Sequence, residues 1–367
     1  MNKLSLDPDC DRVAIELLTE LVRIPSVSRS EATATSWLTE QMQGLGFQAQ
    51  VDQAGNAVGI RERPDDNGEI NETAILLGHI DTVPGEIPLR VEAGNLYGRG
   101  SVDAKGSLAT FVMSAARAKL KPGLRLIVIG AVEEEVTSSK GARYVATQYQ
   151  PDWCVIGEPS SAEAVTLGYK GRLQLELKLV QPSAHSAGPQ IPVAEYAVEW
   201  WMKVKNWCEQ FNQDLSKIFE QVQVGLSDVN TEHDGFAEAV TARVGLRLPV
   251  GFPKADFVDQ CRQYLDEVKS SSELEAELRD FGYEIAHQEG RTSPLVQRFN
   301  RVFRGNDLKP RHKLKTGTSD MNVVAPVWNC PIVAYGPGDS SLDHTPHEHI
   351  LLAEYLQAIN LLRSVLE

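Results

Sequence analysis

Uninterrupted apolar stretches alternate with segments of helical periodicity along the N-terminal part of the chain. Residues 11–22 carry apolar side chains at helical spacing until Pro25, and a second helix is expected over 30–43, before Gly44 and Gly46. Three apolar stretches predict buried strands, at residues 74–78, 124–132 and 153–157. Two amphipathic segments between them, residues 107–119 and 140–147, predict helices. Buried strands that alternate with helices predict an α/β fold with a mostly parallel sheet flanked by helices.

The pattern changes from about residue 168 onward. Residues 173–179 (LQLELKL) alternate strictly between apolar and polar, as in a strand with one solvent-facing side, and residues 240–248 alternate more loosely. Between them, apolar residues recur every three or four positions over 193–211, which predicts a long amphipathic helix. Its apolar stripe, which contains three tryptophans, is expected to pack mainly against its own sheet.

The positions at which the sequence pattern changes suggest that one domain is inserted into another. Residues 271–284 are expected to form a charged helix followed by a strand, after which helices and short strands resume. A chain of 367 residues is long enough for about two domains. We therefore expect an α/β domain formed by residues 1–167 and 288–367, and an α+β domain formed by residues 168–287.

Charge and cysteine content exclude several classes of protein. The chain has 36 Lys and Arg against 50 Asp and Glu, a net charge of −14, which repels nucleic acids and anionic membranes. Its five cysteines lie far apart without a CxxC motif, so neither a disulfide framework nor a cysteine zinc site is expected. No apolar run approaches the ~18 residues of a membrane helix, and the N-terminal segment has acids where a signal peptide needs an apolar core. We expect a cytoplasmic protein.

Side chains that can bind metals follow three of the predicted strands. His79 and Asp81 follow the first, three glutamates (133–135) follow the second, and Glu158 follows the third. In open α/β sheets, functional groups gather beyond the carboxyl ends of the strands, so these side chains are expected to meet. Imidazoles mixed with carboxylates suit zinc, or cobalt or manganese in its place.

Two further candidates come from other parts of the chain. Asp103 immediately precedes a predicted helix, and His344 follows the apolar stretch 331–335. Each residue has an ordinary alternative: Asp103 suits a helix cap, and a single histidine after a strand is most often a hydrogen-bonded loop residue. It is the shared location of these groups that favours a metal site.

Other kinds of catalytic site have little support in the sequence. The segment GRGSVD contains Gly98 and Gly100, but Asp103 replaces the third glycine of a dinucleotide-binding loop, and its charge would repel a pyrophosphate. Neither a Walker lysine motif nor a GxSxG nucleophile motif occurs. A metal-free binding protein or an oxidoreductase remains the alternative from another class.

Several motifs resemble a known enzyme family. The segments HIDTVPG, LYGRGSVDAKG, EEE, IGEPS, SAHSA and GPG…HTPHEH resemble the two-metal deacylases and exopeptidases, which include acetylornithine deacetylase, succinyl-diaminopimelate desuccinylase and glutamate carboxypeptidases. Within that family, TLGYKGRL, KLKTGTSDMNV and VAYGPGDSSLDHTP look most similar to the hydrolases that release lysine or ornithine from an acidic amino-group carrier protein. The resemblance spans nearly the whole chain.

The resemblance implies a zinc-exopeptidase-like catalytic domain that holds two divalent ions, most naturally zinc, with cobalt as a substitute. His79 and Glu158 would hold one ion, Glu135 and His344 the other, and Asp103 would bridge them.

The resemblance also implies the catalytic residues around these ions. Asp81 would orient the imidazole of His79, and Glu134 would be the general base. Relatives have Asp-Glu-Glu where this chain has three glutamates, and spacing to Gly141 favours Glu134 over Glu133 for that role. His185, in the inserted domain, would stabilise the oxyanion in the site of a neighbouring subunit; without the resemblance it suits a solvated turn.

Substrate contacts are implied by position only. Arg247 aligns with an arginine that grips the substrate carboxylate in relatives, although a surface strand residue is the alternative. Lys315, Thr318, Asp320 and Asn322 lie in what is a substrate-binding loop in relatives, where Asp320 is suited either to receive a cationic side chain or to cap a helix.

Taken together, the sequence predicts a metal-dependent amidohydrolase that releases lysine or ornithine from an N-acylated or carrier-linked precursor in lysine or arginine biosynthesis. Its partner would be a small N-acylated amino acid or an acidic carrier protein, and the inserted domain would serve as lid and homodimer contact. A general N-acetyl-amino-acid deacetylase, acting on acetylornithine or acetylcitrulline, and a dipeptidase are the alternatives within the family.

Overall fold

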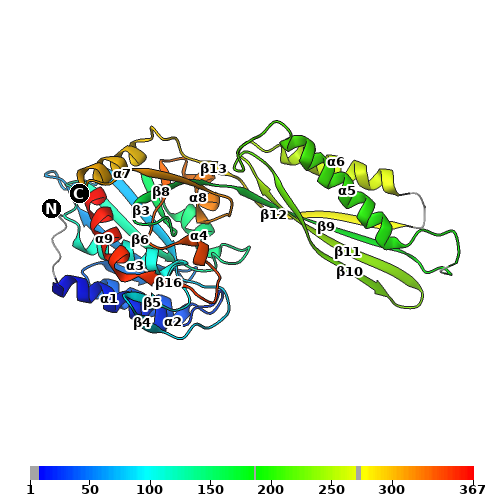
Figure 1. Cartoon of the computed structure of the whole chain (residues 1–367). Coiled ribbons are helices and arrows are strands. Elements are labelled where there is room, and N and C mark those ends of the chain that lie inside the picture. Colours follow the sequence, from blue (N-terminus) through cyan, green and yellow to red (C-terminus); the bar gives the residue numbers. More distant parts are fainter. Residues whose placement is uncertain (1–7, 186, 270–273) are drawn as a thin grey trace. The chain divides into compact units, whose positions relative to one another are not determined.

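The computed structural model describes residues 8–185, 187–269 and 274–367, and the chain divides into two compact units (Figure 1). Unit 1 comprises Met1–Gly168, Gln288–Leu314 and Ser319–Glu367, and unit 2 comprises Tyr169–His287 and Lys315–Thr318. The short segment Lys315–Thr318 groups with unit 2, whereas the sequence analysis left it with the terminal part. The predicted lid and dimer roles of the inserted segment stay predictions.

Unit 1 contains a mixed sheet in which four central neighbours, β6, β3, β7 and β15, run parallel. The order is β1 (Gln48–Val51), β2 (Ala57–Arg63), β6 (Leu124–Ala131), β3 (Glu72–His79), β7 (Trp153–Gly157), β15 (Ile332–Ala334), β8 (Ala164–Tyr169) and β13 (His287–Gln288), with β14 (Arg311–Lys315) paired to β8. The strands β1 and β2 are antiparallel additions at one edge. The predicted α/β fold with a mostly parallel sheet is confirmed.

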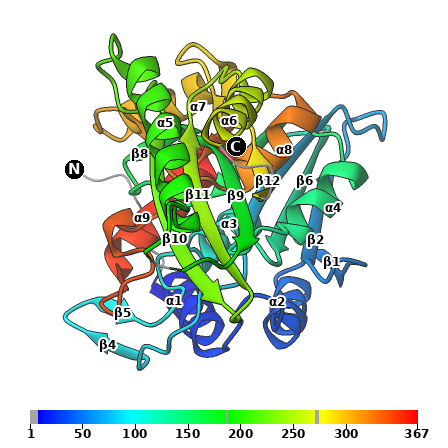
Figure 2. The same ribbon diagram turned by 90° about the vertical axis from the view of Figure 1, so that its right-hand side faces the viewer.

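Helices cover both faces of this sheet (Figures 1 and 2). One layer contains α1 (Pro8–Arg23), α2 (Ala32–Gly44), α3 (Lys105–Arg117), α7 (Pro294–Gly305) and α9 (Leu352–Leu366), and the other contains α4 (Lys140–Gln148) and α8 (Asp320–Trp328). Because both faces are covered, the central strands are apolar on both sides, and Ile75, Leu76, Val128 and Ile129 are all fully or almost fully buried. The buried-strand predictions therefore hold.

A small three-stranded sheet in unit 1 joins distant parts of the chain. Its order is β16 (His349–Leu351), β5 (Asn95–Tyr97) and β4 (Arg90–Glu92), and the turn η1 (Ser340–Leu342) precedes β16. The pairing of β16 with β5 places the segment after Tyr97 beside the segment before His349. This pairing brings the segment of Asp103 close to the segment of His344.

Unit 2 contains an antiparallel sheet in the order β10 (Gln223–His233), β11 (Ala237–Leu248), β9 (Gly171–Pro182) and β12 (Glu275–Glu284). The helices α5 (Val193–Asn212) and α6 (Lys254–Val268) pack on one face, where alternate residues of β9 such as Leu173 and Leu175 are buried. The predicted long helix is confirmed as α5, whose Trp200 is fully buried against its own sheet.

One prediction for unit 2 is wrong. The helix expected within 271–284 lies earlier, as α6, and the described part of that range, from Leu274, leads directly into strand β12. The sequence did carry the signal for α6, because Phe257, Cys261 and Leu265 recur at helical spacing and are all buried. None of the described helices combines the length and apolar character needed to cross a membrane.

Candidate metal centre

Three neighbouring strands deliver side chains to one edge of the sheet of unit 1. Strand β3 lies between β6 and β7, so that His79 pairs in register with Ala131 and Gly78 pairs with Gly157. The chain passes from β3 to β6 on one side and then to β7 on the other, which makes β3 a point where the strand order reverses. Ligands of open α/β sheets bind at such points, beyond the carboxyl ends of the strands.

His79, at the end of β3, contacts two of the predicted metal ligands. Its Nε2 lies 3.2 Å from Oδ1 of Asp103 and 3.9 Å from Oε1 of Glu158, and the imidazole is almost fully buried. His79, Asp103 and Glu135 each offer one ligand atom, and these atoms lie within 4.8 Å of one another. A group of three side chains that could hold a metal ion is therefore assembled from three separate segments.

His344 completes the group from the other end of the chain. Its Nε2 lies 3.0 Å from Oδ2 of Asp103 and 3.0 Å from Oε2 of Glu135. Asp103 therefore contacts a different imidazole with each of its carboxylate oxygens, which is the arrangement expected of a ligand shared by two ions. Contacts thus link all five residues that the resemblance assigned as metal ligands.

Asp81 connects His79 to the loop that carries the predicted base. One of its carboxylate oxygens lies 3.4 Å from Nδ1 of His79, and the buried carboxylate also accepts hydrogen bonds from the backbone N–H groups of Glu134 (3.0 Å) and Glu135 (3.1 Å). The hydroxyl of Ser28 donates a further bond of 2.7 Å. Sequence analysis predicted the orienting contact to His79; the anchoring of the glutamate loop was not predicted.

Glu348 and Arg99 support Asp103, and sequence analysis gave neither a role. Glu348 is fully buried, and its Oε1 accepts the backbone N–H groups of Val102 (2.9 Å) and Asp103 (3.1 Å). Its Oε2 pairs with Arg99 at 2.8 Å, and Arg99 also donates to the backbone oxygen of Thr345, the residue after His344. One ion pair therefore holds both the Asp103 segment and the His344 segment.

Burial and charge shift the pKa of the predicted base. Burial raises the pKa of the Glu134 carboxyl well above its usual range; His79 acts in the opposite direction, and the negative charges of Glu158 and Asp320 raise it further. A carboxylate with a raised pKa accepts a proton more readily, as a general base requires.

The pKa values of the two imidazoles are raised, and the pKa of Asp103 is lowered. Burial acts to lower the pKa of His79, but hydrogen bonds with Asp103 and Asp81 raise it well above its usual value. Hydrogen bonds with Asp103 and Glu135 raise the pKa of His344 to about 10. Burial acts to raise the pKa of Asp103, yet both imidazoles hold it well below its usual range.

Carboxylates this close together repel one another unless positive charge lies between them, which protonated imidazoles can supply. Divalent cations supply it equally well, and the donor set of imidazole nitrogens and carboxylate oxygens is the one that zinc and related metals bind in proteins. The residues present therefore fit a metal centre.

The remaining predicted residues lie in different surroundings. Asn322 accepts the backbone N–H of Ser319 at 2.9 Å in a capping box that starts α8, beside the buried Asp320, and the substrate roles implied for both residues stay predictions. In unit 2, Arg247 donates to the hydroxyl of Thr318 at 3.2 Å, and the Lys315 ammonium lies 5.8 Å from the centre of the Tyr169 ring.

His185 is exposed in unit 2, and its Nδ1 accepts the backbone N–H of Ala187 at 3.1 Å. This contact belongs to a local turn. The substrate and oxyanion roles implied for the residues of unit 2 stay predictions.

Imidazoles and carboxylates that could hold metal ions therefore lie together at the carboxyl edge of a mostly parallel sheet, an arrangement typical of metal-dependent hydrolases. A family model for the peptidase family M20/M25/M40 matches residues 75–367, and the chain belongs to this family. The predicted family is thereby confirmed.

Individual proteins of known name are similar over nearly the whole chain. The LysW-lysine hydrolase of Deinococcus radiodurans is 43% identical over 365 residues, which are 98% of this chain and 97% of that protein. The LysW-lysine/LysW-ornithine hydrolase of Saccharolobus solfataricus is 27% identical over 359 residues, which cover 93% of this chain and 91% of that protein.

Solved structures share the fold at low sequence identity. The aminopeptidase PepT of Bacillus cereus superposes with a TM-score of 0.79 at 16% identity and covers 97% of this chain and 98% of its own. A dinuclear metal binding peptidase of the M20 family from Bacillus subtilis superposes with a TM-score of 0.71 at 13% identity, covering 98% of each chain. At these identities the likeness concerns the fold.

Proposed function

We propose that this chain is a two-metal amidohydrolase that releases lysine, ornithine or both from an amino-group carrier protein. The observation that carries the proposal is Asp103, whose two carboxylate oxygens contact His79 and His344 close to Glu134. The similarity to the LysW-lysine hydrolase, which extends over 98% of the chain, supports the choice of substrate.

In this proposal the five clustered residues hold two ions, zinc in the first place and cobalt as a substitute. His79 and Glu158 would hold one ion, Glu135 and His344 would hold the other, and Asp103 would be a ligand common to both. Bound there, such ions would polarise the amide carbonyl and lower the pKa of a water molecule. Asp81 keeps His79 and the glutamate loop in position through the contacts described above.

Glu134 moves the proton of the reaction. Its carboxylate accepts the proton that the attacking water loses and returns it to the leaving amine, so that the carboxylate is regenerated after each cycle. Anchoring of its backbone by Asp81 limits how far the carboxylate can move.

We also propose that the enzyme is a homodimer that pairs through unit 2, with His185 reaching the site of the neighbouring subunit. Three apolar side chains on or just before α5 are markedly exposed: Val198 (53%), Met202 (45%) and Ile191 (42%). Val198 and Met202 are four residues apart and lie on the same side of the helix. Such a patch suits a self-association surface.

Mixing variants tests this arrangement. His185→Ala should lower turnover on the order of 10²–10³-fold, as loss of one oxyanion donor does. Heterodimers of His185→Ala with a Glu134→Gln subunit should regain part of the activity if His185 acts across subunits. Heterodimers that stay inactive would contradict action across subunits, and a monomer by light scattering would contradict the dimer.

Amine release from a panel of substrates tests the function itself. The enzyme loaded with zinc or cobalt is incubated with a LysW carrier charged with lysine or ornithine, and with acetyl-lysine, acetylornithine, acetylcitrulline and succinyl-diaminopimelate. We expect the charged carrier to react fastest, a chelator to abolish turnover, and about two ions per chain. Faster release from a free acetylated amino acid would make this a general deacetylase, and no release from any substrate would contradict the hydrolase.

A further inference from the structure

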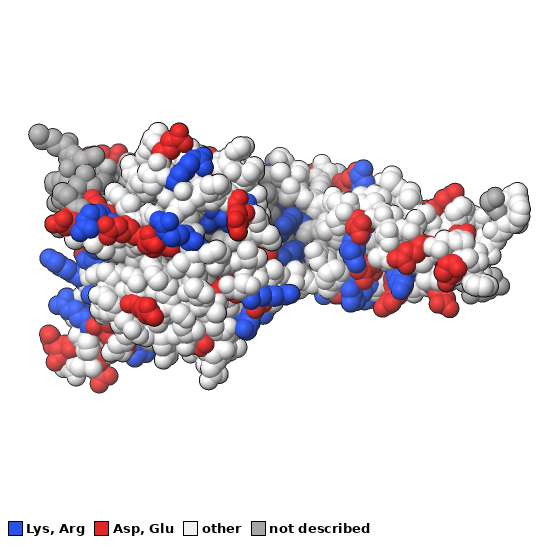
Figure 3. Space-filling model, turned by 90° about the horizontal axis from the view of Figure 1, so that it is seen from below, with Lys and Arg blue, Asp and Glu red and all other residues white. Residues whose placement is uncertain are grey.

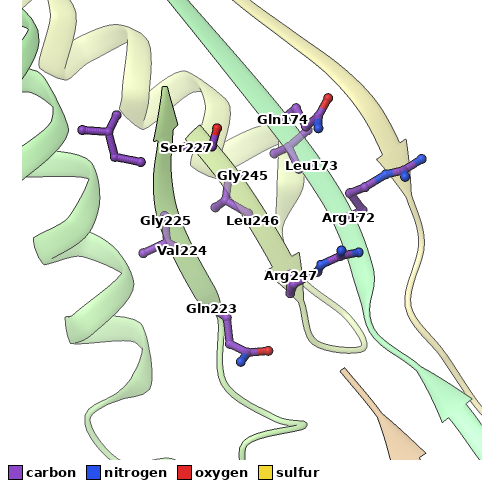
Figure 4. Close-up of a pocket in the computed structure, with 11 residues that line it drawn as sticks. Arg172, Leu173, Gln174, Gln223, Val224, Gly225, Ser227, Gly245, Leu246 and Arg247 are labelled. Carbon is purple, nitrogen blue, oxygen red and sulfur yellow. The ribbon is translucent and has the colours of Figure 1, made fainter. Parts of the chain in front are cut away.

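The sheet of unit 2 has one face covered by α5 and α6 and one open face. On the open face, Arg243 and Arg279 both pair with Glu176, at 2.8 and 2.9 Å, and acidic and basic side chains also lie side by side on the part of unit 2 seen in Figure 3. A cavity at one end of this sheet is lined by Arg172 and Arg247 (Figure 4), and Arg247 already has a predicted substrate role. Neighbouring charges and predicted substrate contacts therefore account for these polar groups of unit 2.

Unit 1 contains a buried acid, Glu31, for which neither explanation holds. Its side chain is 6% exposed and immediately precedes α2, but it forms no capping hydrogen bond with that helix. Burial raises the pKa of its carboxyl, the backbone N–H groups of Arg29 and Glu133 act in the opposite direction, and the negative charge of Asp81 raises it further. Because burial and a nearby like charge disfavour a carboxylate, the stability of the fold does not explain an acid at this position.

The Glu31 carboxylate connects two segments of strained backbone. Its Oε1 accepts the backbone N–H of Arg29 at 2.8 Å and that of Glu133 at 3.1 Å. Arg29 has a φ of 75° and Glu133 a φ of 61°, in the left-handed region that residues other than glycine rarely adopt. Such conformations persist only where the surrounding structure holds them, and they cluster at functional sites. One oxygen of Glu31 therefore holds both residues.

Glu133 is the first of three consecutive glutamates whose backbone N–H groups all donate to buried carboxylates. Glu133 donates to Glu31, whereas Glu134 and Glu135 donate to the two oxygens of Asp81, at 3.0 and 3.1 Å. Two acids thus fix the backbone of the loop at three successive residues. Since the position of a side chain follows from its backbone, loss of the first contact should let the Glu134 carboxylate move.

We propose that Glu31 is a positioning residue for the base Glu134. It acts through the backbone of Glu133, and it does so by the reach of its side chain, because a single oxygen accepts both N–H groups. The proposal rests on the proposed function, in which Glu134 moves the proton. Displacement of a catalytic group by ~1 Å can lower turnover ~10²-fold, so a contact one residue away is enough to matter.

Three substitutions of Glu31 separate the reach of the side chain from its charge. Glu31→Ala should lower kcat ~10–100-fold with little change in KM, because the base is misplaced while substrate contacts remain. Glu31→Gln keeps an oxygen at the same distance from the backbone and should retain most of kcat. Glu31→Asp keeps the charge but is one methylene shorter, so it should behave as Glu31→Ala does.

Hydrogen–deuterium exchange of the metal-loaded, full-length enzyme tests the same contact without turnover. Backbone N–H groups of residues 133–135 should exchange ~10-fold faster in Glu31→Ala and Glu31→Asp than in the parent and Glu31→Gln, because the loop opens more often. The buried strand β3 should exchange at the rate of the parent in every variant, which shows that the fold is intact.

Two exposed positions nearby provide matched controls. Glu40 is an exposed acid on α2, and Ser30 is the exposed neighbour of Glu31 in the same segment. Glu40→Ala and Ser30→Ala should both keep the kcat of the parent and its exchange rates at residues 133–135.

Several outcomes would overturn the proposal. One is unchanged kcat in a folded Glu31→Ala variant, and another is an active Glu31→Asp beside an inactive Glu31→Gln, because charge would then be decisive. Faster exchange throughout β3 in Glu31→Ala would also contradict it, since the loss would then be one of general stability.

Exchange and turnover together separate this proposal from the proposed function. If the parent releases an amine and Glu31→Ala exchanges faster at residues 133–135 without a fall in kcat, Glu31 holds the loop but does not position the base, and the function stands. If the parent releases no amine from any substrate, the proposed function fails, whatever the exchange rates are.

Discussion

Charged residues gather in both units, but under opposite conditions. In unit 1, His79 and the carboxylates around it are largely buried, although His344 is half exposed, and backbone N–H groups hold the carboxylates of Asp81 and Glu348. On the open face of unit 2, the charged pairs around Arg243 and Arg279 are largely exposed. Water screens exposed ion pairs, so each of them contributes little to stability. A buried charge is poorly screened and therefore strongly affects the groups that it contacts.

The comparison leads to different expectations for similar substitutions. Removing one charge in the metal centre of unit 1 should change metal binding or catalysis, because each group there is fixed by several partners and its charge is poorly screened. Removing one charge on the open face of unit 2 should change stability slightly. The following predictions test this contrast from the largest effect to the smallest.

Glu134→Gln should have the largest effect. The amide cannot accept a proton, so turnover should fall on the order of 10²–10⁴-fold, the usual contribution of a general base. Metal content, measured by inductively coupled plasma mass spectrometry, should stay close to that of the parent, because Glu134 is not among the ligands. Loss of metal with loss of activity would mean that base and ligand have been exchanged.

The neighbouring Glu133 offers a matched control for the same loop. Its carboxylate accepts the hydroxyl of Ser138 at 2.6 Å and lies 3.9 Å from Arg29, so its contacts are structural. Glu133→Gln should therefore retain most of the turnover. A loss as large as that of Glu134→Gln would show that the base was chosen wrongly within the run of three glutamates.

Glu348→Ala should have the second largest effect, on metal affinity. It leaves two backbone N–H groups and Arg99 without their acceptor, which loosens the segments of Asp103 and His344. Loss of a residue that orients ligands lowers metal affinity ~10–100-fold. Competition with a coloured chelator measures this.

Two further variants serve as controls for Glu348→Ala. Glu348→Gln retains one acceptor and should fall between the parent and Glu348→Ala. Glu16→Ala removes the partner of Arg12 in an exposed pair on α1 and should leave metal affinity unchanged. Unchanged affinity in a folded Glu348→Ala variant would show that the carboxylate does not position Asp103.

The sequence was sufficient to predict those elements and residue positions that local periodicity determines. Strands β3, β6 and β7 are buried on both faces and therefore read as apolar runs, so the positions of His79 and Glu158 at their ends followed from pattern alone. The long helix α5 followed from its stripe in the same way. The family resemblance supplied the individual roles, and contacts in the structure agree with the grouping it implied.

The sequence was insufficient where tertiary pairing decides. Strands β5 and β16 have three residues each, too few for a periodic signal, yet their pairing brings His344 to Asp103. The burial of Glu348 depends on the same pairing, so a glutamate between two histidines gave no hint of its role. Likewise, Arg172 and Arg247 become neighbours only through the register of β9 and β11.

Unit 2 also contains a buried cation, Lys170, so the effect of burial can be tested there as well. The side chain is fully buried, and burial lowers its pKa to about 8; its ammonium donates to the backbone oxygen of Gln221 and to the side chain of Gln223. Because the folded chain releases this proton more readily than the unfolded chain, stability should rise as pH increases from about 8 to about 10.5.

Urea unfolding at several pH values measures the effect of Lys170. Lys170→Met should remove this part of the rise in stability with pH, because the variant has no proton to release. Lys178→Met, at an exposed position of β9, should keep the slope of the parent. Equal slopes for the parent and Lys170→Met would show that burial does not control this ammonium.

Glu176→Gln should have the smallest effect. It weakens the pairs with Arg243 and Arg279, whose side chains are 51% and 60% exposed. Exposed ion pairs contribute ~0.2–1 kcal/mol each, so the free energy of unfolding should fall by about that amount and less at high salt. Thermal unfolding at low and high salt measures this. A loss of several kcal/mol would mean that these exposed ion pairs stabilise the protein as strongly as buried ones. The solvent exposure of a charge would then no longer predict its contribution to stability, and the contrast between the two units would disappear.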